Sequence, residues 1–141
     1  MHRIDTSAWP LAVFEFEGVQ GLAEHQASLR HWDVLFARGE CFVVVRLFHD
    51  EDSLVHPQDA GRVTKQWLRD GAAALIRDRV TAMLNVVPPA AYPRMKDLSV
   101  EAVFGVPGGV FDSVAAAATW LEARLGLALQ LPARQDRGRP G

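Results

Sequence analysis

Residues 41–49, CFVVVRLFH, are the sequence feature that most constrains the fold. β-Branched and aromatic residues fill this run, and Arg46 alone interrupts its apolar character. A short run that is apolar on both faces and ends at a polar segment is typical of a central strand in a sheet covered on both sides. The sequence therefore predicts a buried central strand that includes Cys41. Because open α/β sheets bind ligands at the carboxyl ends of their strands, residues 50–57 are the first place to look for function.

Strand-like and helix-like patterns alternate along the rest of the chain. Further strands are predicted at residues 2–6, 11–17, 79–87 and 106–111, and helices at residues 21–38, 57–78 and 113–125. This alternation predicts an α/β fold with a mainly parallel sheet of four to five strands and right-handed crossovers. Glu15 and Glu17 indicate that the strand at 11–17 lies near an edge, where charge discourages pairing with a second chain.

The 141-residue length, without an internal repeat or a linker, predicts one domain over residues 1–127. Residues 128–141 are expected to form a disordered tail. A net charge of −2 and the lack of a basic run before this tail argue against nucleic-acid binding. No apolar stretch approaches the roughly 20 residues that span a bilayer, and no signal-peptide pattern opens the chain. We therefore expect a cytoplasmic protein without membrane insertion.

The segment after the central strand combines two imidazoles, three carboxylates and a hydroxyl: His49, Asp50, Glu51, Asp52, Ser53 and His56. Such groups can bind metal ions or act as acids and bases, but their spacing matches no established metal motif. A solvated acidic loop is the simpler interpretation, so the sequence predicts neither a metal nor a cofactor. Ser53 could accept a phosphate, whose charge would repel Asp50 and Asp52. No nucleophile motif is present, and Cys41 lacks an adjacent base.

Arg46 and Asn85 are polar residues inside two apolar strand segments. If they are buried, each needs a partner, because an unpaired polar group costs about 1–3 kcal/mol. The plain interpretation is an edge-facing Arg46 and an Asn85 bonded to backbone. The alternative is that both side chains line a cleft on one face of the sheet.

Three segments resemble the STAS-like, anti-sigma-factor-antagonist-like domains of bacteria: IDTSAWPLAVFEFEG at residues 4–18, CFVVVRLF at 41–48 and VFDSVAAAATWLEARL at 110–125. The resemblance implies a superhelix of βα units with strands in sequential order. It also implies that the loop after a central strand carries an Asp-Ser pair whose serine a partner kinase phosphorylates; Asp52-Ser53 occupies the comparable place. The chain departs from this pattern in having His56-Pro57 instead of a small, Gly-containing helix start.

These observations predict a non-enzymatic bacterial domain that binds a protein partner and could form a homodimer. A first alternative is a binder of a small apolar or lipid-like ligand, which requires a cavity lined by residues such as Phe42, Val44, Trp67 and Met83. A second alternative is a metal-dependent or acid/base enzyme centred on His49, Asp50, Asp52 and His56.

Overall fold

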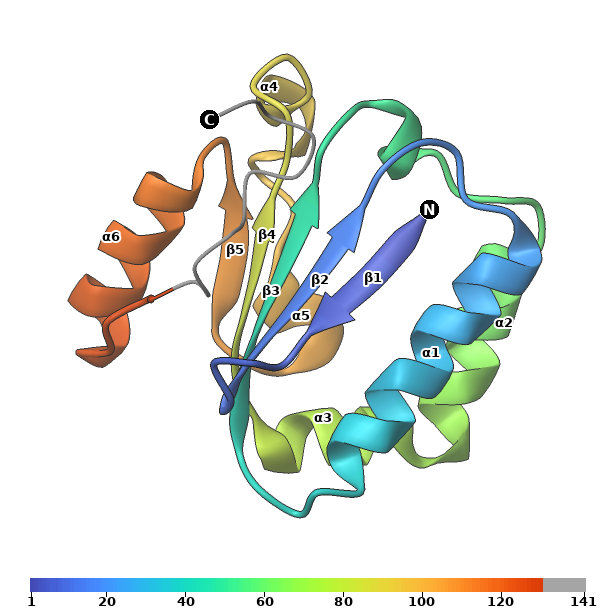
Figure 1. Cartoon of the computed structure of the whole chain (residues 1–141), viewed down its shortest axis with the longest axis horizontal. Helices are drawn as coiled ribbons and strands as arrows, with labels where there is room; N and C mark the ends of the chain where they lie inside the picture. Colours follow the sequence, from blue (N-terminus) through green and yellow to red (C-terminus); the bar gives the residue numbers. More distant parts are fainter. Residues whose placement is uncertain (131–141) are drawn as a thin grey trace.

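A five-stranded β-sheet forms the centre of the protein (Figure 1). The computed structural model describes residues 1–130. Its strands are β1 (His2–Asp5), β2 (Leu11–Phe16), β3 (Phe42–Phe48), β4 (Val80–Val86) and β5 (Gly108–Phe111). Each strand lies within a segment whose sequence pattern predicts one, so the expectation of four to five strands is confirmed.

The strands lie in the sheet in the same order as in the chain, β1-β2-β3-β4-β5. β1 runs antiparallel to β2, and the remaining three pairs of neighbours are parallel. β3 therefore lies in the middle, with two strands on each side, as its apolar sequence predicts. The predicted α/β fold with a mainly parallel sheet is confirmed.

β2 lies near an edge of the sheet, as predicted, but Glu15 does not have the role predicted for it. This strand pairs with β1 on one side and β3 on the other, so β1 and not β2 is the edge strand. Glu15 is only 7% exposed and does not protect an edge. The role predicted for Glu15 was wrong because a charged residue in a strand was attributed to solvent exposure, whereas the Glu15 carboxylate contacts Arg3 and His49.

Six α-helices follow from residue 22 onward within the described part of the chain: α1 (Leu22–Phe36), α2 (Ala60–Trp67), α3 (Ala73–Arg79), α4 (Tyr92–Met95), α5 (Val100–Phe104) and α6 (Val114–Leu125). The predicted ends of α6 are confirmed. Ser113 accepts a hydrogen bond from the Ala116 N–H at 3.0 Å, and Gly126 ends the helix at a φ of 68°.

The single helix predicted at residues 57–78 is instead two helices. The first one begins at Ala60, after a turn in which the Ala60 N–H donates to the Pro57 carbonyl oxygen. Between α2 and α3, the segment Leu68–Ala72 contains Gly71 at a φ of 131°. That backbone conformation is open to glycine and strained for other residues, so Gly71 is the physical reason for the break.

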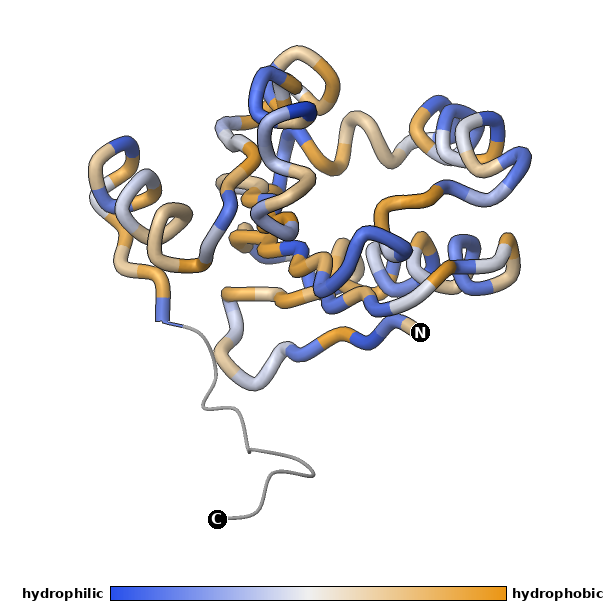
Figure 2. The backbone as a smooth tube through the Cα atoms, turned by 90° about the horizontal axis from the view of Figure 1, so that it is seen from above, coloured by the Kyte–Doolittle hydropathy of each residue, from blue (hydrophilic) through white to orange (hydrophobic). Residues whose placement is uncertain are grey.

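Helices cover the two faces of the sheet unequally. We call the face that packs against α1, α2, α3 and α5 the α1 face, and its core includes Phe14, Trp32, Val44, Ile76 and Met83. The opposite face, which we call the α6 face, packs against α6. The sheet contributes Val13, Val45 and Leu84 to this contact, and α6 contributes Ala117 and Leu121. Both views place α6 on one side of the molecule and α1 and α2 on the other, with hydrophobic segments gathered along the central strands (Figures 1 and 2).

Two expectations concern the margins of this core. Cys41 was predicted to be buried in the central strand, but it is exposed, because β3 begins one residue later. Most of the tail expected over residues 128–141 lies outside the described residues. No helix in residues 1–130 combines the length and apolar character needed to cross a membrane.

Candidate functional site

Asp50, directly after β3, connects two loops at the carboxyl ends of β2 and β3. Both of its carboxylate oxygens lie 3.1 Å from the Gly18 backbone nitrogen, and one accepts from the Ser53 N–H at 2.9 Å. Partial desolvation raises the pKa of the Asp50 carboxyl, but these N–H groups outweigh it and hold the pKa below its ordinary value. We call this arrangement the Asp50 clamp. It fixes the loop after β2 against the loop after β3.

Ser53, the predicted phosphoacceptor, lies within the short 3₁₀ turn Asp52–Leu54 and is only 5% exposed. Its hydroxyl donates to the Asp50 carbonyl oxygen at 2.6 Å. The hydroxyl is therefore part of the turn that presents the Asp50 clamp. A kinase could reach it only after this turn opens.

The other polar side chains of the loop point to different partners. Glu51 pairs with Arg94 beyond β4 at 2.7 Å, and Asp52 and His56 are exposed. His56 lies close enough to His25 of α1 to contribute, after burial, to a lowered His25 pKa. No three His, Cys, Asp or Glu side chains in residues 1–130 converge in a way that could hold a metal ion.

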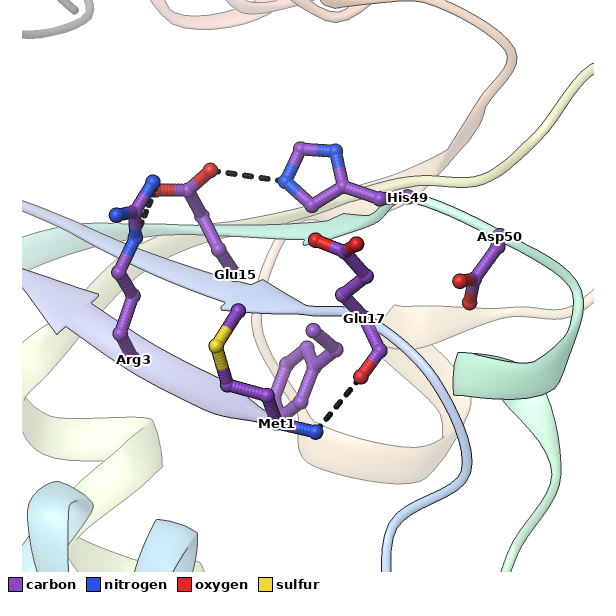
Figure 3. Close-up of a pocket in the computed structure, with 7 residues that line it drawn as sticks. Met1, Arg3, Glu15, Glu17, His49 and Asp50 are labelled. Atoms are coloured by element: carbon purple, nitrogen blue, oxygen red, sulfur yellow. Dashed lines mark hydrogen bonds and ion pairs between the residues drawn. The ribbon is translucent and has the colours of Figure 1, made fainter. Parts of the chain in front are cut away.

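His49 belongs to a cluster that the sequence analysis missed. The Glu15 carboxylate lies 2.8 Å from His49 Nε2, and its second oxygen lies 2.9 Å from an Arg3 Nη atom and accepts from Arg3 Nε at 3.0 Å. Figure 3 shows Arg3 and His49 approaching Glu15 from opposite sides. Arg3 faces Glu15 because β1 and β2 are antiparallel in the register Arg3↔Glu15. Only this register, which no local motif specifies, could have identified the cluster.

A pocket of about 250 Å³ opens beside this cluster, lined by Met1, Arg3, Glu15, Phe16, Glu17, His49 and Asp50 (Figure 3). Its lining includes the Arg3 guanidinium and the carboxylates of Glu15, Glu17 and Asp50. Glu15 orients the His49 imidazole, as a carboxylate does in acid–base pairs. No Ser, Thr, Cys or Lys side chain lines the pocket to act as a nucleophile. The arrangement is suited to polar recognition at a surface.

Arg46 and Asn85 lie side by side on β3 and β4, on the α1 face. Arg46 Nε donates to Asn85 Oδ1 at 2.6 Å, so Asn85 bonds to a side chain and not to backbone. The guanidinium carbon lies 5.9 Å from the ring centres of both Phe48 and Phe104. Although the Arg46 side chain as a whole is only half-buried, burial lowers its pKa to about 10.

A second pocket, of about 580 Å³, lies at the opposite end of the sheet. We call it the apolar groove; its lining residues are Ala8, Pro10, Leu11, Cys41, Phe42, Val43, Thr81, Leu121, Leu127, Ala128, Leu129 and Gln130. Of the residues expected to line an apolar cavity, Phe42 contributes to it. Val44 and Met83 are 0% exposed, and they pack with Trp67 into the core of the α1 face.

Comparison with models of known protein families, with characterised proteins and with solved structures found no match.

Proposed function

We propose that the protein is a non-enzymatic regulatory domain that binds a protein partner. The binding surface is formed by residues 17–21 and 49–57, which we call the β2–β3 rim. The observation that carries the proposal is the Asp50 clamp, which joins the two loops of this rim through the Gly18 and Ser53 N–H groups. A surface whose loops are already fixed loses little conformational entropy when it binds.

The rim also carries the mixture of groups that protein interfaces use. Val19 is 60% exposed and Val55 is 53% exposed, one on each of the two loops. Glu17, Asp52 and His56 provide exposed polar groups around them. Apolar contacts surrounded by a polar rim are the usual composition of such interfaces.

Ser53 supplies a means of regulation. A phosphate on Ser53 would remove its hydrogen bond to the Asp50 carbonyl oxygen and add negative charge beside the Asp50 carboxylate. Both effects act against the clamp, so the two loops of the rim would separate. Because Ser53 is buried, this switch requires the 3₁₀ turn to open before a kinase can act.

The STAS-like resemblance is part of the same proposal. The sequential strand order is the order that this resemblance implies, and Ser53 follows a central strand as the phosphorylated serine of such domains does. A bacterial cytoplasmic location and a capacity to form homodimers complete the proposal.

The test is affinity capture with the full chain, comparing three baits. Wild-type protein and Val34→Asp should capture the same partner, because Val34 is 63% exposed on α1 and outside the rim. The double variant Val19→Asp/Val55→Asp should capture at least about tenfold less of that partner, because binding would desolvate the new charge at each apolar contact. Equal capture by all three baits contradicts the proposed surface.

A second candidate function is binding of a small apolar or lipid-like ligand in the apolar groove. The volume of about 580 Å³ and the mainly aliphatic lining favour it, since ligand sites commonly combine these properties. A fluorescent fatty acid titrated into the protein tests this function. Leu127→Asp should weaken binding about tenfold, whereas Leu98→Asp, an exposed leucine elsewhere, should not. Equal affinities for the two variants would exclude the groove as the binding site.

A further inference from the structure

Arg46 is a charged residue on the α1 face of the sheet, next to the apolar core and only partly buried. The register across the sheet sets Phe14, Arg46, Asn85 and Val110 side by side on four neighbouring strands. Side chains two residues apart on a strand share a face, so Arg46 and Asn85 follow the buried Val44 and Met83. The positive charge thus lies beside one polar residue, Asn85, in a row whose outer members, Phe14 and Val110, are apolar.

The protein supplies little to compensate this charge. Arg46 Nε donates to the neutral Oδ1 of Asn85, and no carboxylate in residues 1–130 lies within ion-pair distance of Arg46. Its Nη atoms donate to no oxygen of the described residues. Burial disfavours the charged form, which is consistent with the lowered pKa of about 10.

Part of the Arg46 side chain is exposed, and its Nη edge has no hydrogen-bond partner among the described residues. The ring centres of Phe48 and Phe104 each lie 5.9 Å from the guanidinium carbon. Asn85 fixes the Nε edge. The site lies close to the carboxyl end of β3, which ends at Phe48, and this is the end of an open α/β sheet at which ligands bind.

We propose that Arg46 binds an oxyanion, a carboxylate or phosphate group of a ligand, through the Nη edge of its guanidinium. A guanidinium whose Nε is already held by Asn85 presents two parallel N–H groups in the geometry that matches two oxygens of such an anion. The anion supplies the missing negative charge and accepts hydrogen bonds from the Nη atoms. This site is independent of the proposed partner surface, which lies on the loops beyond β2 and β3.

The test is an NMR titration of the full chain with inorganic phosphate and, separately, with acetate. Binding should shift the resonances of the Arg46 Nε–H and of the Phe48 and Phe104 backbone amides. Arg46→Met should weaken binding by about tenfold to a hundredfold, the effect of losing a charge-assisted hydrogen bond to the anion. Arg30→Met removes an exposed arginine of α1 and should leave the affinity unchanged.

The same spectra report whether each variant is folded. If Arg46→Met does not fold, Arg46→Lys replaces it, since lysine keeps the charge but cannot donate two parallel hydrogen bonds. Arg46→Lys should bind several-fold more weakly than wild type. The proposal is overturned if neither anion shifts the Arg46 resonance, if the replacement at Arg46 binds as wild type does, or if Arg30→Met loses as much affinity. A preference between phosphate and acetate identifies which oxyanion the site takes.

Discussion

Glu15 and Arg46 are charged residues on the neighbouring strands β2 and β3, and the protein accommodates them in different ways. Glu15 lies on the α6 face, where its carboxylate contacts both Arg3 and His49. Arg46 lies on the α1 face, where its hydrogen-bond partner is the neutral Asn85 and two phenylalanine rings flank it. Glu15 is buried and Arg46 is partly buried, but only the carboxylate is paired with opposite charge by the described residues.

This difference separates a structural ion pair from a site that can bind a ligand. Removing one member of a paired cluster leaves its partners with uncompensated charge, which is costly. Removing a charge that has only a neutral partner loses a hydrogen bond, but it also removes the desolvation penalty of that charge. The two contributions to the free energy of unfolding therefore partly cancel. The stability of suitable variants can therefore test the distinction directly.

The largest effect is expected for Glu15→Ala. This variant should lower the free energy of unfolding by about 3 kcal/mol, since Arg3 and His49 lose their shared partner while remaining partly buried. Urea denaturation measures the change. Glu17→Ala, an exposed glutamate two residues along, is the matched control and should change stability by less than about 0.5 kcal/mol. Similar losses in the two variants would show that Glu15 is not a paired structural charge.

Arg46→Met should have a smaller effect, a loss of about 1 kcal/mol in the free energy of unfolding. Methionine fills a similar volume between Phe48 and Phe104, and the cost comes mainly from Asn85 Oδ1, which loses its donor. The same urea experiment measures it. A loss as large as that of Glu15→Ala would break the comparison, because it would mean that Arg46 is compensated within the protein.

Asp50 is a third kind of charged residue, because its carboxylate accepts hydrogen bonds from backbone N–H groups. Its pKa in the folded protein lies below the ordinary value of 3.8, so the carboxylate stabilises the fold above that pH. This contribution is lost as the pH falls through the folded pKa. Thermal unfolding from about pH 7 to about pH 2 should show Asp50→Asn less stable than wild type near neutrality, with the difference closing in acid. Asp52→Asn, an exposed neighbour outside the Asp50 clamp, is the matched control.

The smallest effect is expected for His49→Gln. The glutamine amide can still donate to Glu15, and Arg3 continues to supply the positive charge, so the loss should be about 0.5 kcal/mol. Urea denaturation at neutral pH measures it. A loss above that of Arg46→Met would mean that His49, and not Arg3, is the main partner of Glu15.

The sequence was sufficient to predict the helices and strands that depend only on residues within or next to them. β3 follows from its apolar run, and α6 follows from the Ser113 cap and Gly126. The interruption at Gly71 was missed, because an isolated glycine within a helical pattern can be tolerated, and only its φ shows that the helix is interrupted. Cys41 was placed inside β3 because strand ends are defined by pairing and not by residue type.

The candidate site was less predictable, because its groups meet through pairing between segments. The loop at residues 49–56 was identified, and Asp50 and Ser53 bond to each other within it. Glu51 and His49 instead have partners outside the loop, Arg94 and Glu15. Arg46 and Asn85 were both singled out as polar residues in apolar strands. That they bond to each other follows from the parallel register of β3 and β4, which the sequence does not display.

The strand order has a consequence for how the chain folds. Because neighbours in the sheet are also consecutive strands along the chain, the sheet can grow by the addition of one strand at a time. Each addition closes only the connection between two consecutive strands, which keeps the entropic cost of every step low. A nascent chain that has emerged only as far as β4 already contains every strand that flanks β3, so the centre of the sheet can assemble before the final helix exists.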